Sequence, residues 1–334
     1  MEKITQIHNH RNNSIDNKIK NINIGTDFTY DLFESIKSNR SAIEKRTTTL
    51  IGRRSIKKQW QAAWLLKAIT LLDLTTLSGD DSPSKVDRLC SKAINPLRKD
   101  LIKELGIEKN EISVAAVCVY HSLINVACKK LENSNIPVAA VSAGFPAGLS
   151  PMETRINEIS LSIHNGAKEI DIVIDRSNIF KGNWKAIYNE VKSFKKICVG
   201  AKLKTIIATG DISTFKNIYK ASTVCMMAGA DFIKTSTGKE STNATLPVSL
   251  VMIRAIRDYF ENTGYRVGFK AAGGISTAKD SLSYLTLIKE ELGNDWLNSN
   301  LFRIGASSLL SDIERQLEHF ITEKYSSFNR HAMS

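Results

Sequence analysis

Short apolar runs and amphipathic segments alternate along most of this chain. Runs of mainly apolar residues recur eight times, at 68–72, 114–119, 138–143, 170–174, 203–207, 230–233, 266–269 and 301–305. Each run is nearly continuous in apolar character, as expected of strands that are buried on both faces. The segments between them are long enough for helices and carry an apolar stripe, as residues 154–163 illustrate.

Eight strand–helix units in succession predict an α/β fold, a (β/α)8 TIM barrel with an N-terminal extension. An open Rossmann-like sheet is the alternative, but no G-x-G-x-x-G motif follows the first strand. Residues 1–55 are predicted to form the extension, polar and partly disordered at its start and then helical. The barrel is expected over residues 56–322, beginning with a helix at 56–66, and a flexible tail over 323–334.

Two of the apolar runs end in a lysine, Lys234 in one case and Lys270 in the other. Burying an ammonium group costs several kcal/mol unless it is paired or loses its proton. A neutral lysine is an amine nucleophile, able to form a Schiff base with a carbonyl substrate. A lysine that reaches solvent from a strand end is the alternative for either residue alone. Two of them on neighbouring strands can face one pocket, where we expect each to lower the pKa of the other.

Other unusual polar residues fall near the C-terminal ends of the predicted strands, where TIM-barrel active sites lie. They are Asp73 after the first strand, Cys118 on the second, Asp171 on the fourth and Lys204 on the fifth. Asp171 is the only carboxylate that we place inside an apolar strand, and a buried carboxylate needs a cationic or hydrogen-bonding partner. It could relay protons for the lysines, or form a plain ion pair in the barrel core.

Glycines and serines follow the last strands, where this fold commonly binds phosphate through backbone N–H groups. The residues are Gly238 and Lys239 after the sixth strand, Gly273, Gly274 and Ser276 after the seventh, and Gly305, Ser307 and Ser308 after the eighth. We expect the serines to donate to phosphate and to cap the following helices. Tight turns would explain either loop alone, whereas the two loops together favour a small sugar phosphate or aldehyde phosphate as ligand.

Six segments resemble the deoxyribose-phosphate aldolase family, over about residues 60 to 320. They are LLDLTTL (71–77), AAVCVY (115–120), AGFPAG (143–148), DFIKTSTGK (231–239), VGFKAAGG (267–274) and LFRIGASSLL (301–310). The resemblance implies a TIM-barrel lyase that works through a Schiff base, without a cofactor. Such an enzyme cleaves 2-deoxy-D-ribose 5-phosphate to glyceraldehyde 3-phosphate and acetaldehyde.

The same resemblance implies roles for individual residues. Lys234 matches the Schiff-base lysine, Lys270 the second lysine that perturbs it, and Asp171 the acid that shuttles a proton with Lys270 through water. Lys204 and Cys118 match positions that line the substrate pocket. The remaining predicted substrate contacts are Asp73, Thr235, Gly238, Lys239, Gly273, Gly274, Ser276, Gly305, Ser307 and Ser308.

Three positions qualify the resemblance. Ala271 stands where the family commonly has proline, which should loosen the turn slightly. Ser276 stands where the family commonly has arginine, and loss of that cation is expected to weaken phosphate binding. Family members can also carry a catalytically helpful tyrosine near a mobile C-terminus, and Tyr325 lies in the corresponding tail.

About half of the net charge of +12 lies near the N-terminus, where residues 1–60 hold 12 Lys/Arg against 6 Asp/Glu. The basic cluster at 53–58 could contact RNA or an acidic protein. A solvated helix explains the cluster as well, because no aromatic residues are interleaved with it. A catalytically lapsed barrel that binds RNA or protein is therefore one rival function. Another Schiff-base aldolase with a different donor is the second.

Composition narrows the remaining possibilities. No apolar run approaches the roughly 20 residues that span a membrane, and the first residues lack the apolar core of a signal peptide. Five cysteines form no C-x-x-C pair, which predicts reduced thiols and a cytoplasmic protein. The six histidines follow no metal-ligand spacing within the predicted strands, so we expect amine rather than metal chemistry. The oligomeric state stays open, a homo-oligomer included.

Overall fold

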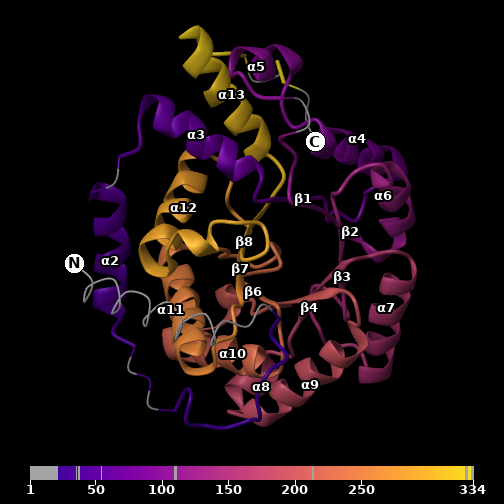
Figure 1. Ribbon diagram of the computed structural model, residues 1–334. Coiled ribbons are helices and arrows are strands. Elements are labelled where there is room, and N and C mark those ends of the chain that lie inside the picture. The colour runs from indigo at the N-terminus through magenta and orange to yellow at the C-terminus, as the bar shows by residue number, and fades with distance from the viewer. Residues whose placement is uncertain are drawn as a thin grey trace, which may run out of the picture.

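The computed structural model describes residues 22–34, 36, 38–53, 55–108, 111–212, 214–327 and 330–331. Eight parallel strands form a closed barrel in chain order, surrounded by helices (Figure 1). The strands are β1 Leu72–Thr75, β2 Ala116–Tyr120, β3 Val138–Ser142, β4 Glu169–Val173, β5 Lys202–Ile206, β6 Phe232–Lys234, β7 Gly268–Ala272 and β8 Phe302–Ala306. The predicted (β/α)8 barrel is therefore confirmed.

The outer layer consists of helices that connect successive strands, preceded by two helices of the N-terminal region. The helices are α2 Arg40–Arg53, α3 Lys58–Ile69, α4 Pro83–Ile94, α5 Lys99–Glu104, α6 Ile124–Leu131, α7 Met152–His164, α8 Ser177–Phe180, α9 Trp184–Ile197, α10 Phe215–Met227, α11 Leu246–Thr263, α12 Ala278–Leu292 and α13 Leu309–Thr322. Short 3-10 turns lie at His121–Leu123, Thr209–Asp211 and Asn294–Trp296. Helix α2 packs against α11 and α12, and α3 against α12 and α13. Among the described helices, none combines the length and the apolar character needed to cross a membrane.

The first strand begins later than the sequence predicted. We expected it at 68–72, but Ala68 and Ile69 end helix α3, and β1 starts only at Leu72. In that helix Leu65, Ala68 and Ile69 are all buried, at the spacing of one helical face. A short apolar run cannot be assigned to strand or helix from its composition, and here the helical period holds. As a result Asp73 lies within β1 rather than after it.

The two faces of the barrel strands differ in chemistry. Outward-facing side chains such as Val117 and Val119 belong to the main apolar cluster, which they share with the surrounding helices. On the inner face, Cys118, Ala139 and Val141 form a small separate apolar cluster with residues near the mouth. The inward positions of the other strands carry the charged side chains Asp73, Glu169, Asp171, Lys204, Lys234, Lys270 and Arg303. Apolar packing on the outer face therefore holds a barrel whose interior is mostly ionic.

Part of the N-terminal extension is built into the core. The Asn23 side chain is buried and donates hydrogen bonds to the carbonyl oxygens of Met226, at 2.9 Å, and Ala230, at 2.8 Å. Phe33 is fully buried, with its ring edge-on to Trp184. Residues 1–21, where we expected the disordered start, lie outside the described residues, and the division into extension, barrel and tail stays a prediction.

We expect Asn23→Ala to lower the free energy of unfolding by about 1–3 kcal/mol, because buried polar groups lose their partners. Besides the two carbonyls, the Tyr259 hydroxyl donates to Asn23 Oδ1 at 3.1 Å. Chemical denaturation measures the change. The exposed Asn262, whose amide contacts a carbonyl within its own helix, is the control, and Asn262→Ala should stay within about 0.5 kcal/mol. Equal effects of the two substitutions would contradict an anchoring role for Asn23.

Candidate active site

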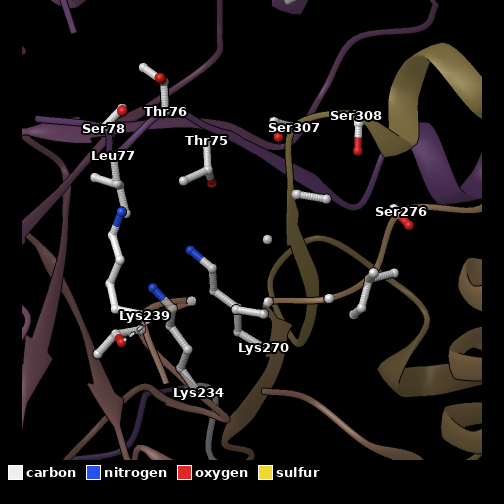
Figure 2. Close-up of a pocket in the computed structure, with 18 of the residues that line it drawn as sticks. Thr75, Thr76, Leu77, Ser78, Lys234, Lys239, Lys270, Ser276, Ser307 and Ser308 are labelled. Atoms are coloured by element: carbon white, nitrogen blue, oxygen red, sulfur yellow. Dashed lines mark hydrogen bonds between the residues drawn. The ribbon is translucent and has the colours of Figure 1, made fainter. Parts of the chain in front are cut away.

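A cavity of about 440 Å³ opens at the C-terminal ends of the strands. Figure 2 shows three lysines extending into it, Lys234, Lys239 and Lys270. Its wall is completed by residues at the ends of β1, β6, β7 and β8 and in the segments that follow them, including Thr75, Thr76, Ser78, Gly238, Gly273, Gly274, Ser276, Gly305, Ser307 and Ser308. The cavity is therefore polar, and its lysines could attract an anionic ligand.

Strand register brings the two central lysines together. Lys234 on β6 lies opposite Lys270 on β7 in the parallel ladder. Their Nζ atoms lie 2.8 Å and 2.9 Å from the same oxygen of Asp171, Oδ2. Asp171 comes from β4, is fully buried and lies behind the lysines rather than in the cavity wall. Gly305 makes room for this arrangement, since a Cβ atom there would stand 3.1 Å from Cε of Lys270.

The two lysines differ in their electrostatics. Burial lowers the pKa of Lys234, and the attraction of Asp171 does not offset it, while Lys270 adds repulsion in the same direction. Burial also disfavours the Lys270 ammonium, but Asp171 and Asp73 outweigh it and hold the pKa of Lys270 above its usual value. The expectation that each lysine lowers the pKa of the other is wrong for Lys270. Lys234 is therefore the more easily deprotonated of the two buried lysines.

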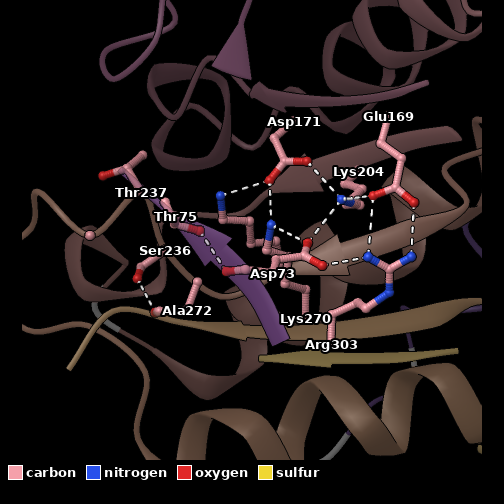
Figure 3. A network of polar contacts seen from close by, with 12 residues as sticks. Asp73, Thr75, Glu169, Asp171, Lys204, Ser236, Thr237, Lys270, Ala272 and Arg303 are labelled. Carbon is pink, nitrogen blue, oxygen red and sulfur yellow. Dashed lines mark hydrogen bonds and ion pairs between the residues drawn. The ribbon is translucent and has the colours of Figure 1, made fainter. Parts of the chain in front are cut away.

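An ion network continues beneath the lysines through the barrel interior (Figure 3). Nζ of Lys204 lies 2.5 Å from Glu169, 3.0 Å from Asp73 and 3.2 Å from Asp171. Nζ of Lys270 lies 2.6 Å from Asp73. Arg303 pairs with Asp73 and, at 2.8 Å, with Glu169. Each carboxylate therefore meets at least two cations.

This network corrects the expectation that Asp171 is the only carboxylate inside an apolar strand. Asp73 lies in β1, and Glu169 lies in β4 two residues before Asp171, so both point to the same face. Sequence reasoning gave no role to Glu169 or Arg303. The signal was present as a period of two along β4, but Glu169 lies at the first position of its strand, where a charged residue is unremarkable.

Four predicted substrate contacts do not line the cavity. Lys204 and Asp73 lie in the network below it, and Cys118 lies in the inner apolar cluster. Burial raises the pKa of the Cys118 thiol. The hydroxyl of Thr235 is also buried, donating to the Ala272 carbonyl at 3.1 Å and accepting from the Ala272 N–H at 2.9 Å. Through this pair of bonds Thr235 joins the ends of β6 and β7.

The loops at the cavity need glycine at two points. Gly273 has a φ of +83°, and a Cβ atom there would stand 2.7 Å from Asn243. Gly238 has a φ of +84°, in the left-handed region that suits glycine. Its N–H is engaged by the Glu240 carboxylate at 3.2 Å, so the predicted N–H for phosphate already has a partner in this structure.

The predicted capping by serines is wrong. Helix α12 is capped by Thr277, which forms a reciprocal capping box with Asp280, and Ser276 lies one residue earlier. Ser308 occupies the cap position of α13 but makes no side-chain capping hydrogen bond. The cavity-lining hydroxyls of Ser276 and Ser308 are thus not committed to the helix ends.

Some features of the mouth were not predicted. Lys85 lines the cavity from the first turn of α4 and pairs with Asp81 at 2.7 Å. The signal for it in the sequence was its place just after the loop that follows a barrel strand, where active-site residues of this fold occur. Tyr325 is exposed and stacks on His319, with ring centroids 4.2 Å apart, away from the cavity lining. Among the described residues, no group of three or more His, Cys, Asp or Glu side chains is arranged to hold a metal ion.

We expect Lys204→Met to lower the free energy of unfolding by about 3–5 kcal/mol, because three buried carboxylates lose a shared cation. Lys202 is a matched control: it lies two residues earlier in β5, is partly exposed and donates to Asn300 at 2.8 Å. Lys202→Met should cost less than about 1 kcal/mol. Urea titrations compare the two. A small effect of Lys204→Met would mean that the network does not depend on this cation.

Comparison with known proteins identifies the family. The profile of the DeoC/LacD family aldolases matches residues 67–313. Deoxyribose-phosphate aldolase of Homo sapiens is 54% identical over 314 residues, which cover 93% of this chain and 99% of the human protein. The Mus musculus protein of the same name is 54% identical over 312 residues, covering 93% of this chain and 98% of its own.

Solved structures share the barrel. The aldolase QR15 is 26% identical, with a TM-score of 0.58, covering 77% of this chain and 99% of that chain. The tetrameric deoxyribose phosphate aldolase of Aeropyrum pernix has a TM-score of 0.56 at 21% identity, covering 79% and 98%, and at that identity the likeness concerns the fold alone. The chain thus belongs to the DeoC/LacD family of aldolases, within which its curated relatives are deoxyribose-phosphate aldolases.

Proposed function

We propose that this protein is a class I aldolase that cleaves 2-deoxy-D-ribose 5-phosphate to D-glyceraldehyde 3-phosphate and acetaldehyde, in the catabolism of deoxyribose phosphates. The observation that carries the proposal is Lys234, an amine at the floor of the cavity whose pKa is lowered by burial. Its carboxylate partner, Asp171, is shared with the charged Lys270. The identity to the human and mouse aldolases supports the choice of substrate.

The phosphate group is proposed to bind at the rim, away from the reacting carbonyl. Lys239 supplies a charge, and the uncommitted hydroxyls of Ser276 and Ser308 supply donors. Ser307 and Ser308, which immediately precede α13, line this side of the cavity, and the backbone N–H groups of a helix N-terminus favour an anion. A phosphate held there leaves the aldehyde end of the sugar directed at Lys234.

Schiff-base formation begins when neutral Lys234 attacks the aldehyde carbon. The resulting carbinolamine loses its hydroxyl as water, which requires a proton. Lys270 is charged and can give that proton, with Asp171 accepting and returning it through a water molecule. Asp171 suits this relay because its Oδ1 accepts no hydrogen bond from the described residues, although Lys204 lies 3.2 Å away.

Cleavage follows from the iminium formed on Lys234. The iminium accepts the electron pair of the C2–C3 bond as the C3 hydroxyl loses its proton to the relay, and glyceraldehyde 3-phosphate is released. The remaining two-carbon enamine is protonated on carbon and hydrolysed. Acetaldehyde leaves, and Lys234 returns as a free amine.

The direct test measures acetaldehyde release from 2-deoxyribose 5-phosphate. Wild type should be active, and Lys234→Met should lose at least about 10³-fold, because the substitution removes the proposed Schiff-base amine. Borohydride added with substrate should leave a stable mass on Lys234. Lys202→Met, at the opposite end of the barrel, is the active control. Labelling at another residue would falsify the assignment of the nucleophile.

A different Schiff-base aldolase remains the rival within the same class. Parallel assays with ribose 5-phosphate and fructose phosphates separate the two. A larger kcat/KM for either of these than for 2-deoxyribose 5-phosphate would replace the proposed substrate while leaving the role of Lys234 intact.

Ser276→Arg should lower KM for the phosphorylated sugar by about fivefold, since a partly exposed charge-assisted contact contributes on the order of 1 kcal/mol. Ser276 lines the rim of the cavity and is exposed. Steady-state kinetics with 2-deoxyribose 5-phosphate and unphosphorylated 2-deoxyribose make the comparison. Ser276→Gln controls for side-chain size. An equal change in KM for both sugars would argue that position 276 does not face the phosphate.

Three further properties stay predictions. A homo-oligomer is to be tested by solution mass measurement. A cytoplasmic location is consistent with five cysteines that are all unpaired.

Contact of RNA or a protein with the basic segment is best tested at Lys57 and Lys58, which are exposed, because deleting residues 1–58 would also remove the buried Asn23 and Phe33.

A further inference from the structure

Seven ionisable side chains meet inside the barrel, and two of them, Lys234 and Lys270, also line the cavity. The carboxylates are Asp73, Glu169 and Asp171, and the cationic groups are Lys204, Lys234, Lys270 and Arg303. None of the seven residues is more than 2% exposed. The seven residues come from six strands, and because Lys234 and Lys270 line the cavity, the charge of the cluster acts directly on the reaction.

The number of charges in this cluster is informative. With three carboxylates ionised, three cations give a net charge of zero, and a fourth would leave an uncompensated positive charge in the interior. An uncompensated buried charge costs several kcal/mol, so one of the four cationic groups is expected to release its proton. Arginine does not do so in proteins, which leaves the choice among the three lysines.

Contacts decide which lysine is neutral. Lys204 meets three carboxylates and Lys270 meets two, whereas Lys234 meets only Asp171. The pKa values shift accordingly: carboxylate contacts raise those of Lys204 and Lys270, and burial lowers that of Lys234. Lys234 is therefore the one group for which losing a proton costs least.

Arg303 and Glu169 complete this balance from a distance. Neither lines the cavity, and neither forms an ion pair with Lys234. Arg303 lies beside Lys270 in the ladder between β7 and β8, and it joins Asp73 to Glu169. Lys204 and Lys270 neutralise only two of the three carboxylates. Removing Arg303 would therefore leave one negative charge uncompensated, and Lys234 would keep its proton to balance it.

We propose that Arg303 and Glu169 are positioning residues for the aldolase reaction, which fix the charge of the barrel interior so that Lys234 is the group left uncharged. The proposal rests on the Schiff-base role of Lys234 given above. It goes beyond the effect of Lys270, because it assigns the reactivity of the nucleophile to an ion pair that touches neither the nucleophile nor the cavity.

Other groups near the cluster do not change the count. Cys118 faces the lysines, but burial raises the pKa of its thiol and keeps it neutral. Lys202 lies at the opposite mouth of the barrel, partly exposed, where burial lowers its pKa and Asn300 accepts its hydrogen bond. Lys239 extends into the same cavity but is exposed at its rim, where solvent screens its charge, so the buried balance depends on the seven side chains named.

The proposal predicts pH shifts of opposite sign. In Arg303→Met, three carboxylates face two fixed cations, so Lys234 should hold its proton to higher pH. The acid limb of the pH profile of kcat/KM should therefore move to higher pH. In Glu169→Gln, three cations face two carboxylates, so the limb should move down. Each shift should be about one pH unit, on the order of the effect of one nearby charge at an effective dielectric constant of about 20.

The double variant is the decisive measurement. Arg303→Met combined with Glu169→Gln leaves two carboxylates and two fixed cations, and the limb should return to within about 0.3 pH unit of wild type. Arg303→Lys keeps the charge and should also keep the wild-type limb, even if Arg303→Met folds poorly. Structural damage alone cannot produce opposite shifts that cancel.

A second readout separates this proposal from the choice of substrate. Acetaldehyde with cyanoborohydride alkylates Lys234 only when the amine is neutral, and comparing variants with wild type at each pH cancels the pH dependence of the reagents. If wild type is labelled but does not cleave 2-deoxyribose 5-phosphate, the proposed function fails and the labelling still tests the charge balance.

The buried pair Lys92–Glu314, 2.6 Å apart and outside the cavity, supplies the control. Lys92→Met should lower thermal stability without moving either limb. The proposal is overturned if Arg303→Met and Glu169→Gln shift the labelling profile in the same direction. It is equally overturned if they behave like Lys92→Met, with lower Tm and unmoved profiles.

Discussion

The contact on which this structure depends is the one between Asp171 and the lysines around it. Its two oxygens lie within 3.2 Å of Nζ atoms from β5, β6 and β7, and the cations hold its pKa well below the usual range against the opposing effect of burial. A carboxylate so placed is ionised in the resting site. It therefore holds the lysines in position. Because it is one negative charge facing three lysines, Lys204 and Lys270 also pair with other carboxylates.

The barrel provides this contact because its two faces are stabilised in different ways. Outward side chains bury apolar surface against the helices, which is where we expect most of the folding free energy to arise. The inner face can then carry ions, provided that each has partners. Small residues make the room: a Cβ at Gly268 would stand 2.3 Å from the Phe232 ring, and one at Gly305 would crowd Lys270.

How far the site could be predicted depended on how each residue stands out from its neighbours. Lys234 and Lys270 were found because a lysine within an apolar run is chemically unusual. Glu169 and Arg303 were not, because their meaning comes from a partner across the barrel, which no local pattern encodes. The (β/α)8 fold followed from the alternation of elements, whereas the start of β1 was misplaced because the last buried residues of α3 continue the same apolar run.

The same electrostatics explains why the two ends of the cavity are chemically distinct. A phosphate dianion close to Lys234 would raise its pKa and suppress the neutral amine. The rim avoids this by offering loop hydroxyls, backbone N–H groups and the exposed Lys239, all outside the buried cluster. The interior, with its ion pairs matched, contributes little net attraction for an anion. Affinity for phosphate and reactivity of the amine can therefore be set by separate residues. A change at the rim such as Ser276→Arg need not alter the charge of the nucleophile.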